Sequence, residues 1–397
     1  MNQLLKMNKM MAICLLICFF TNCKKNDLVQ SIQPDSNLQS NKTGENNARQ
    51  AFGSAIIKTF AGSDVFGYGG DGGTVGNALL NGPQGIYADK RGDIYISDLG
   101  NNVIRKVNGI SGIISTVAGN GIFGFSGDGG PATQASLGVA FHTATDVFGN
   151  LYISDLANNR IRRIDKTTGI IQTIAGTGLP DFNGDGHTAL QTNLNEPFGL
   201  AFDMNGDLIF SDGTGLRLRK LNMRTKIIST LAGNGDRGYG GDGGPAKSAI
   251  FNFIWNVAID HGCGDIYVSD ESNFRIRKIS MTTGKISTVA GNGVLGNSGM
   301  GGPATQASLT QPVGIAIDKN SNLFISDEIL SQVYSIDKKT GIINLIAGNG
   351  TNGFFGDGGA AENAILSHPN SLSFDPDGNL YICDGNNNRI RIITRLR

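Results

Sequence analysis

A seven-residue segment returns six times in this chain at an almost constant spacing. Its clearest copy is Ile-Ile-Ser-Thr-Val-Ala-Gly at residues 113–119, and successive copies start 57 or 58 residues apart. The six copies start at Ile56, Ile113, Ile170, Ile227, Lys285 and Ile342. A tandem array therefore runs from Ile56 to Arg397, and a fixed period of this size indicates a solenoid or a propeller.

Each repeat contains four short segments that are typical of β-strands. In the second repeat they are residues 113–117, 143–145, 151–154 and 160–164, which are rich in β-branched and aromatic residues. Turn-forming Asp, Asn and Gly residues separate these segments. Six repeats of four antiparallel strands predict an all-β fold, a six-bladed β-propeller with four-stranded blades.

The two ends of the array each hold an incomplete blade. Residues 56–60 form a fourth strand with no preceding strands, whereas residues 371–373, 380–382 and 389–391 supply three strands with no fourth. We expect the N-terminal strand to complete the last blade, because shared closure removes both free edges of the ring.

The array resembles the NHL repeat. The resemblance rests on Pro-x-Gly-Ile-Ala-x-Asp at 312–318, Gly-Asn-Leu-Tyr-Ile-Ser-Asp at 149–155 and Asn-Asn-Arg-Ile-Arg at 158–162, and it covers residues 56–397. A Gly-Asp-Gly-Gly insert, best seen at 119–133, makes each copy longer than an ordinary NHL repeat and similar to the NHL propeller of teneurins. The resemblance implies a six-bladed propeller. Six-bladed relatives include lyases and lactone hydrolases that work at the top of the central channel, usually with a metal.

The N-terminal residues have the pattern of a bacterial lipoprotein signal. Lys6 and Lys9 precede the apolar run 10–20, which is too short to span a bilayer, and Cys23 follows. The resemblance implies cleavage before Cys23 and a lipid on its sulfur.

These patterns divide the chain into three parts. We expect a signal peptide at residues 1–23, a flexible polar tether at 24–55 and the propeller at 56–397. The predicted location is the cell envelope, as a lipoprotein of the outer membrane or cell surface, with plain secretion as the alternative. Cys263 and Cys383, in different repeats, make no disulfide framework.

The charge balance narrows the range of partners. The chain has 33 basic and 33 acidic residues, so it lacks the positive field that nucleic acid or an anionic membrane attracts. We expect a monomer that meets the membrane only through its lipid anchor and binds a protein or a carbohydrate, with no nucleic acid.

Several residues recur at fixed positions and favour structural roles. Alternating strand directions predict that all six inserts lie on one face, the top. Five inserts carry an Asp, with Met300 in the other copy: Asp71, Asp128, Asp185, Asp242 and Asp357. These carboxylates could form a ring for cations or sugars, but turn capping is the favoured interpretation.

Two further positions repeat just as regularly. An Asp ends the second strand in every copy: Asp98, Asp155, Asp212, Asp270, Asp327 and Asp384. An Arg recurs in the third strand of five copies, with Tyr334 in the remaining one: Arg105, Arg162, Arg219, Arg277 and Arg391. Because a catalytic group is needed only once, we interpret the Asp as a turn cap and the Arg as a blade-to-blade ion pair or a solvated edge.

The departures between copies are the better guide to a binding site. Near the start of the first strand, alternate blades carry a polar residue where the others have Gly, and three adjacent blades carry an aromatic residue one position earlier. Aromatic faces beside hydrogen-bonding groups suit sugars. With a histidine that precedes the last blade, the candidate ligand-binding residues are Phe141, His142, Phe198, Trp255, Asn256, His368 and Ser371. The alternative is that the aromatic residues fill gaps between blades.

A possible metal site lies in the third insert. Asp181, Asn183 and Asp185 match the first half of a calcium loop, but Thr192 stands where a bidentate Glu should follow. Calcium is the one cofactor that the sequence suggests, and drift of the common insert template explains the match equally well.

The sequence therefore favours a binding module that uses its top face, with no catalytic residues. One alternative is a lyase or lactone hydrolase with a metal-assisted site at the channel mouth, which would require His142, Asn256, His368 and Ser371 to converge. The other is a structural spacer without a ligand.

Overall fold

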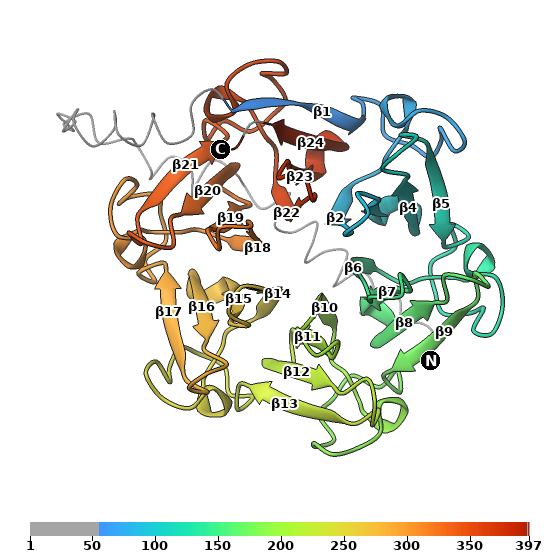
Figure 1. Cartoon of the computed structure of the whole chain (residues 1–397), viewed down its shortest axis with the longest axis horizontal. Helices are drawn as coiled ribbons and strands as arrows, with labels where there is room; N and C mark the ends of the chain where they lie inside the picture. The colour runs from blue at the N-terminus through green and yellow to red at the C-terminus, as the bar shows by residue number, and fades with distance from the viewer. Residues whose placement is uncertain (1–54, 395, 397) are drawn as a thin grey trace, which may run out of the picture. The chain divides into compact units, whose positions relative to one another are not determined.

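A computed structural model describes residues 55–394 and 396, and in it six four-stranded antiparallel sheets form a ring (Figure 1). The predicted six-bladed all-β propeller is confirmed. The first strand of each blade lies at the centre and the fourth at the rim, and the first strands of neighbouring blades adjoin around the channel. The predicted signal peptide and all of the predicted tether except Ala55 lie outside the described residues.

The strands of each blade follow from the centre outwards. Blade 1 contains β2 (Pro83–Ala88), β3 (Ile94–Asp98), β4 (Val103–Val107) and β5 (Ile114–Ala118). Blade 2 contains β6 (Ala140–Thr145), β7 (Leu151–Asp155), β8 (Arg160–Ile164) and β9 (Ile171–Ala175). Blade 3 contains β10 (Pro197–Phe202), β11 (Leu208–Asp212), β12 (Arg217–Leu221) and β13 (Ile228–Ala232). Blade 4 contains β14 (Ile254–Ile259), β15 (Ile266–Asp270), β16 (Arg275–Ile279) and β17 (Ile286–Ala290). Blade 5 contains β18 (Pro312–Ile317), β19 (Leu323–Asp327), β20 (Gln332–Ile336) and β21 (Ile343–Ala347). Blade 6 contains β22 (Pro369–Phe374), β23 (Leu380–Asp384), β24 (Arg389–Thr394) and β1 (Ile56–Gly62).

Short 3-10 helices mark two kinds of connection in the described residues. Each insert holds one: η1 (Val75–Asn77), η3 (Ala132–Gln134), η5 (Ala189–Gln191), η6 (Ala246–Ser248), η8 (Ala304–Gln306) and η9 (Ala361–Asn363). Four blades hold another after the second strand: η2 (Leu99–Asn101), η4 (Leu156–Asn158), η7 (Glu271–Asn273) and η10 (Gly385–Asn387).

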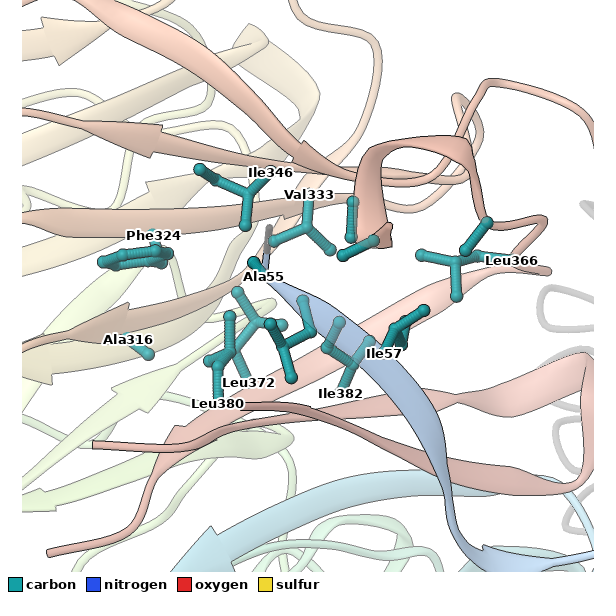
Figure 2. Close-up of a cluster of buried hydrophobic side chains, with 14 residues drawn as sticks. Ala55, Ile57, Ala316, Phe324, Val333, Ile346, Leu366, Leu372, Leu380 and Ile382 are labelled. Atoms are coloured by element: carbon teal, nitrogen blue, oxygen red, sulfur yellow. The ribbon is translucent and has the colours of Figure 1, made fainter. Parts of the chain in front are cut away.

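The N-terminal strand closes the ring, as the sequence predicted. Strand β1 pairs antiparallel with β24, with Ile57 opposite Ile393, so the two ends of the array share blade 6. Ile57 is fully buried and lies in an apolar cluster with Val333 of blade 5 and Ile382 of blade 6 (Figure 2). The closing strand thus contributes both ladder hydrogen bonds and core contacts.

The inserts follow a path that the strand directions did not predict. Each one reaches the rim and pairs with the fourth strand of the next blade, as in the bridge between Thr74 and Ile113 and the equivalent bridge between Pro131 and Ile170. The expectation that all inserts lie over the top face is therefore wrong for their central parts. Their central residues cover the outer edge of each blade, which protects an otherwise open strand edge.

A recurring packing pattern fixes each insert on the body of the ring. One large apolar residue per insert is fully buried: Leu80, Leu137, Leu194, Phe251, Leu309 and Leu366. Close approach also requires glycine, since Gly127 has a φ of 83° and a Cβ there would lie 2.6 Å from the Ala135 Cα. The inserts are thus anchored loops.

The described residues contain no helix that is long and apolar enough to cross a membrane.

Candidate functional site

Three positions in each blade meet at the top end of the channel, which we call the mouth. They are the residue before the first strand, the second residue of that strand, and the residue after the second strand. Backbone hydrogen bonds hold the first and third positions together: Leu156 N donates to Val139 O over 2.9 Å, and Glu271 N to Phe253 O over 3.1 Å. Residues that are far apart in sequence therefore share one rim.

One side of the mouth is an aromatic cluster. Phe141 contacts Phe198 and Trp255 edge to face, with ring centroids 5.1 and 5.3 Å apart, and Phe198 lies 5.0 Å from Trp255. Phe253 completes the cluster, 5.1 Å from Phe198 and 5.5 Å from Trp255. Phe141 and Phe198 are buried, whereas Phe253 and Trp255 are partly exposed. Only the last two rings can offer surface to a ligand.

The other side of the mouth is acidic. Glu271 of blade 4 hydrogen-bonds Gln311, and Glu328 of blade 5 lies close enough to Glu271 and Asp327 for their charges to interact. Burial, together with these two neighbouring carboxylates, raises the pKa of Glu328 to about 8. Burial also raises the pKa of Glu271. The pair can therefore hold a proton near neutral pH and can donate as well as accept hydrogen bonds.

Blade 6 contributes amide and imidazole groups to this rim. His368 Nδ1 lies 2.8 Å from the Asn386 amide nitrogen. Asn370 is buried, and neither of its side-chain amide atoms has a hydrogen-bond partner among the described residues. A Cβ on Gly385 would lie 2.9 Å from the Asn370 amide nitrogen and 3.3 Å from that of Gln84, so Asn370 and Gln84 both lie over this glycine.

His142, Asn256 and Ser371 lie one residue deeper and are buried. His142 Nδ1 accepts from Leu200 N of the next blade over 3.4 Å, and Ser371 Oγ donates to Ile86 O over 3.4 Å. Asn256 Oδ1 accepts from the neighbouring Val257 N over 2.7 Å. Burial lowers the pKa of His142 to about 4. These observed bonds satisfy the strand backbones and do not link the three side chains to one another.

The alternation of polar residues and glycine has a steric cause. A Cβ on Gly85 would lie 2.1 Å from Phe141 O, and a Cβ on Gly314 would lie 2.1 Å from Asn370 O. Odd-numbered blades therefore need glycine, because the first strand of the following blade passes too close for a side chain.

The recurring arginines form buried ion-pair triads. Arg162 is fully buried between Asp128 of the insert, at 2.7 Å, and Asp155 of its own blade, at 3.2 Å. Asp155 Oδ1 also accepts from Gly138 N over 2.8 Å but makes no side-chain cap hydrogen bond to η4, so this carboxylate fixes the end of the insert and does not cap the turn after β7. The prediction of a solvated edge is wrong, and the insert aspartates pair with arginine instead of lining an open ring. The same triad occurs around Arg105, Arg219, Arg277 and Arg391.

Blade 5 replaces the triad with an apolar contact. Tyr334 stands at the arginine position, is fully buried, and packs in one cluster with Met300 of the insert. Asp327 accepts instead from the backbone amides of Thr310, Gln311 and Leu330, over 2.7, 3.1 and 3.3 Å.

The calcium-loop residues have protein partners. Asp185 pairs with Arg219 at 3.2 Å and accepts from Thr230 N, and Asn183 Oδ1 accepts from Asn193 N. Asp181 is exposed and caps Phe182 N. Among residues 55–394 and 396, no group of three or more His, Cys, Asp or Glu side chains could hold a metal ion. The geometry therefore gives the calcium prediction no support.

Sequence reasoning missed several mouth residues, among them Phe253, Glu271, Gln311 and Glu328. A sequence signal for the two glutamates was present at the position after the second strand. In the six copies this position reads Leu99, Leu156, Gly213, Glu271, Glu328 and Gly385. A comparison of departures at that position, and not only in the first strand, would have found the acidic pair.

The fold and the repeats define the chain as an NHL-repeat β-propeller, and the family model for the NHL repeat matches residues 366–393. Within that class, the chain is 30% identical to teneurin-3 of Mus musculus over 354 residues, which are 81% of this chain and 12% of teneurin-3. The chain spans between 12% and 26% of the length of the first curated relatives that it matches.

Solved structures share the fold. An auxiliary nutrient binding protein from Bacteroides ovatus has a TM-score of 0.62 and 15% identity, covering 86% of this chain and 76% of that one. A gluconolactonase from Xanthomonas campestris has a TM-score of 0.55 and 14% identity, covering 87% and 92%. A binding protein and an enzyme thus share this fold, so the function has to be argued from the site.

Proposed function

We propose that this protein is an envelope-anchored NHL propeller that binds a carbohydrate, or a protein that presents one, at the mouth. The single observation that carries the proposal is the composition of the mouth, where the partly exposed Trp255 and Phe253 adjoin Glu271, Gln311 and Glu328 of blades 4 and 5. Aromatic rings cover the apolar face of a sugar, and carboxyl and amide groups bind its hydroxyls.

Two sets of residues contribute differently to this site. Trp255 and Phe253 would contact the ligand, whereas the buried Phe141 and Phe198 hold the two outer rings in position. His142, Asn256 and Ser371 act as positioning residues, because their observed hydrogen bonds go to strand backbones. His368 is buried beside Asn386, at the blade 6 side of the same rim.

The geometry favours binding over catalysis. The enzyme alternative needs His142, Asn256, His368 and Ser371 to act together, and the hydrogen bonds observed for them go to other residues. A gluconolactonase shares the fold, but at 14% identity this likeness supports only the architecture.

Glycan arrays probed with the full chain test the proposed function. We expect retention of at least one glycan class, and we expect Trp255→Ala to weaken that binding by roughly 1–3 kcal/mol, as for a central aromatic anchor. Phe148→Ala, an exposed aromatic residue in the turn between β6 and β7, is the matched control and should bind like the parent. Binding that survives Trp255→Ala, or a chain that retains neither glycans nor glycoproteins, would contradict the proposal.

Anchoring is a separate part of the proposal, and Cys23 lies outside the described residues. The charged start, short apolar run and Cys23 support a lipoprotein signal. We expect Cys23→Ala to move the protein out of the membrane fraction or to leave its signal uncleaved. Unchanged fractionation and unchanged gel mobility, with Cys263→Ala as the control, would exclude lipidation at Cys23.

A further inference from the structure

A second hollow lies at the opposite end of the first strands from the mouth. It is a cavity of about 1180 Å³ lined by residues from the first strands of all six blades and by the turns that follow these strands in blades 1 to 4, with His261 from blade 4. Its lining does not include Phe141, Phe198 or Trp255. The cavity is therefore distinct from the mouth, and it opens on the bottom face.

The inner wall of this cavity is mainly apolar. Its lining includes Leu200, Phe202, Val257, Ile259, Ile315 and Ile317. His142 is among the few polar residues at this depth, and its Nδ1 already accepts a hydrogen bond from Leu200 N. Such a wall offers little to a sugar but suits a hydrocarbon chain.

Cations lie on one side of the bottom opening, in turns of blades 1 and 3. Four exposed basic residues line the cavity there: Lys90, Arg91, Arg224 and Lys226. None of them forms an ion pair with another of the described residues. The Lys166 ammonium and the Arg91 guanidinium both lie close to Gly149, because a Cβ on this glycine would be 3.3 Å from the first and 3.5 Å from the second.

The acidic residues at this opening are already engaged. Asp89 accepts from the backbone amides of Arg91 and Asp93, both over 2.9 Å. Asp203 and Asp207 both pair with Lys220 at 2.8 Å, and Asp146 caps Phe148 N over 3.0 Å. The lysines and arginines are therefore the groups that remain available to an anionic ligand.

The turns at the opening also expose apolar side chains. Val147, Phe148 and Met204 are 76%, 76% and 64% exposed and line the cavity. Exposed apolar residues clustered at a cavity entrance indicate an interaction site. They extend the apolar wall to the point where the cations begin.

We propose that this cavity binds a long-chain carboxylate of the fatty-acid class, with its acyl chain in the channel and its carboxylate at the cationic opening. The apolar wall and the cations of the opening carry the assignment, because each matches one end of such a ligand. Lys90 and Arg91 would bind the carboxylate, since both line the cavity in the turn between β2 and β3. This proposal is independent of sugar binding at the mouth.

Calorimetric titration of the full chain with palmitate and dodecanoate, below their micelle concentrations, tests the proposal. We expect saturable one-to-one binding, at least tenfold weaker binding of methyl palmitate, and no measurable binding of acetate. No binding of palmitate, or equal affinity for the methyl ester, would overturn the proposal.

Two variants locate the site. The double variant Lys90→Glu/Arg91→Glu should weaken palmitate binding at least tenfold, whereas Lys58→Glu/Lys247→Glu, which changes two exposed lysines elsewhere, should bind like the parent. Ala201→Phe, at a partly exposed cavity-lining position, should weaken binding of the longer chain more than that of the shorter one. Thermal melts check the fold, and if Ala201→Phe does not fold, the surface charge variants decide. Equal palmitate affinity in the two double variants would refute this site.

Discussion

At the scale of single residues, the ligand-binding residues that the sequence predicted fall into two groups in the structure. Phe141, Phe198 and Trp255 do come together, in one cluster with Phe253. His142 and Ser371 bond to the strand of the next blade, and their alternation with glycine follows from close backbone contact. A departure from a repeat therefore identifies an unusual environment, which can be a binding surface or a packing contact.

Glu328 makes the pH dependence of the mouth testable. Its pKa is raised to about 8 by burial and by the nearby Glu271 and Asp327, so the folded state holds this proton more tightly than the unfolded state. The free energy of unfolding should therefore fall as the pH rises from about 4.5 to about 8. One pKa unit corresponds to about 1.4 kcal/mol, and since Glu328 is partly exposed we expect roughly 2 kcal/mol in all.

Glu328→Gln removes this contribution. Urea unfolding should give the variant and the parent the same free energy of unfolding at pH 5. At pH 9 the variant should have the higher free energy of unfolding. Glu362→Gln, in the exposed turn of η9, is the control and should follow the parent at both pH values. An equal stability difference at both pH values would show that Glu328 is not the proton-holding group.

At the scale of structural elements, the triads explain how a glycine-rich insert is fixed. Five inserts bring an Asp to a buried Arg, and the aromatic ring three residues before that Asp lies over the guanidinium, as Phe125 lies 4.7 Å from Arg162. In blade 5 all three partners change together, to Asn297, Met300 and Tyr334. The joint change indicates that ring, Asp and Arg act as one unit.

Arg162→Ala should destabilise the fold by about 3–5 kcal/mol, because it leaves the buried Asp155 without its cation. Asp128→Ala should cost only about 1 kcal/mol, since this carboxylate is partly exposed. Urea unfolding measures both, and Arg224→Ala, at an exposed arginine with no ion pair among the described residues, should change little.

The Met and Tyr of blade 5 can be placed in another blade to test whether the insert Asp and the buried Arg are energetically coupled. Asp128→Met/Arg162→Tyr should be more stable than Arg162→Ala, but below the parent, because Asp155 lacks the three backbone donors that Asp327 has. Additivity of the two single changes in a double-mutant cycle would show that the partners are independent.

At the scale of the whole molecule, the fold was predictable and much of the site was not. The 57-residue period, the four strands per repeat and the incomplete blades at the two ends of the array determine the ring and its closure. The path of the inserts depends on hydrogen bonds to the outer edge of a blade, such as the one from Gly72 N to Ile114 O. No local sequence pattern predicts these bonds. The acidic pair of Glu271 and Glu328 arises from turns in different blades and appears only when the ring closes.

Removal of β1 tests the closure of the ring. The deletion exposes the edge of β24 and removes the fully buried Ile57 and Ala61. Loss of Ile57 alone is worth about 2–5 kcal/mol, so the thermal midpoint should fall by roughly 10 °C or more. Lys58→Ala, exposed on the same strand, should leave it unchanged, and an unchanged midpoint after deletion of β1 would argue against closure by this strand.

The fluorescence of Trp255 tests the central claim of ligand binding at the mouth most directly. Trp255 is the only tryptophan in the chain, and its ring is partly exposed beside Phe253, so its emission reports on this surface alone. Titration with an array-selected glycan should shift the emission in a saturable way, with the Kd that calorimetry gives for the same glycan. Calorimetric binding of that glycan without any change in Trp255 emission would contradict the account, because the ligand would then lie elsewhere on the ring.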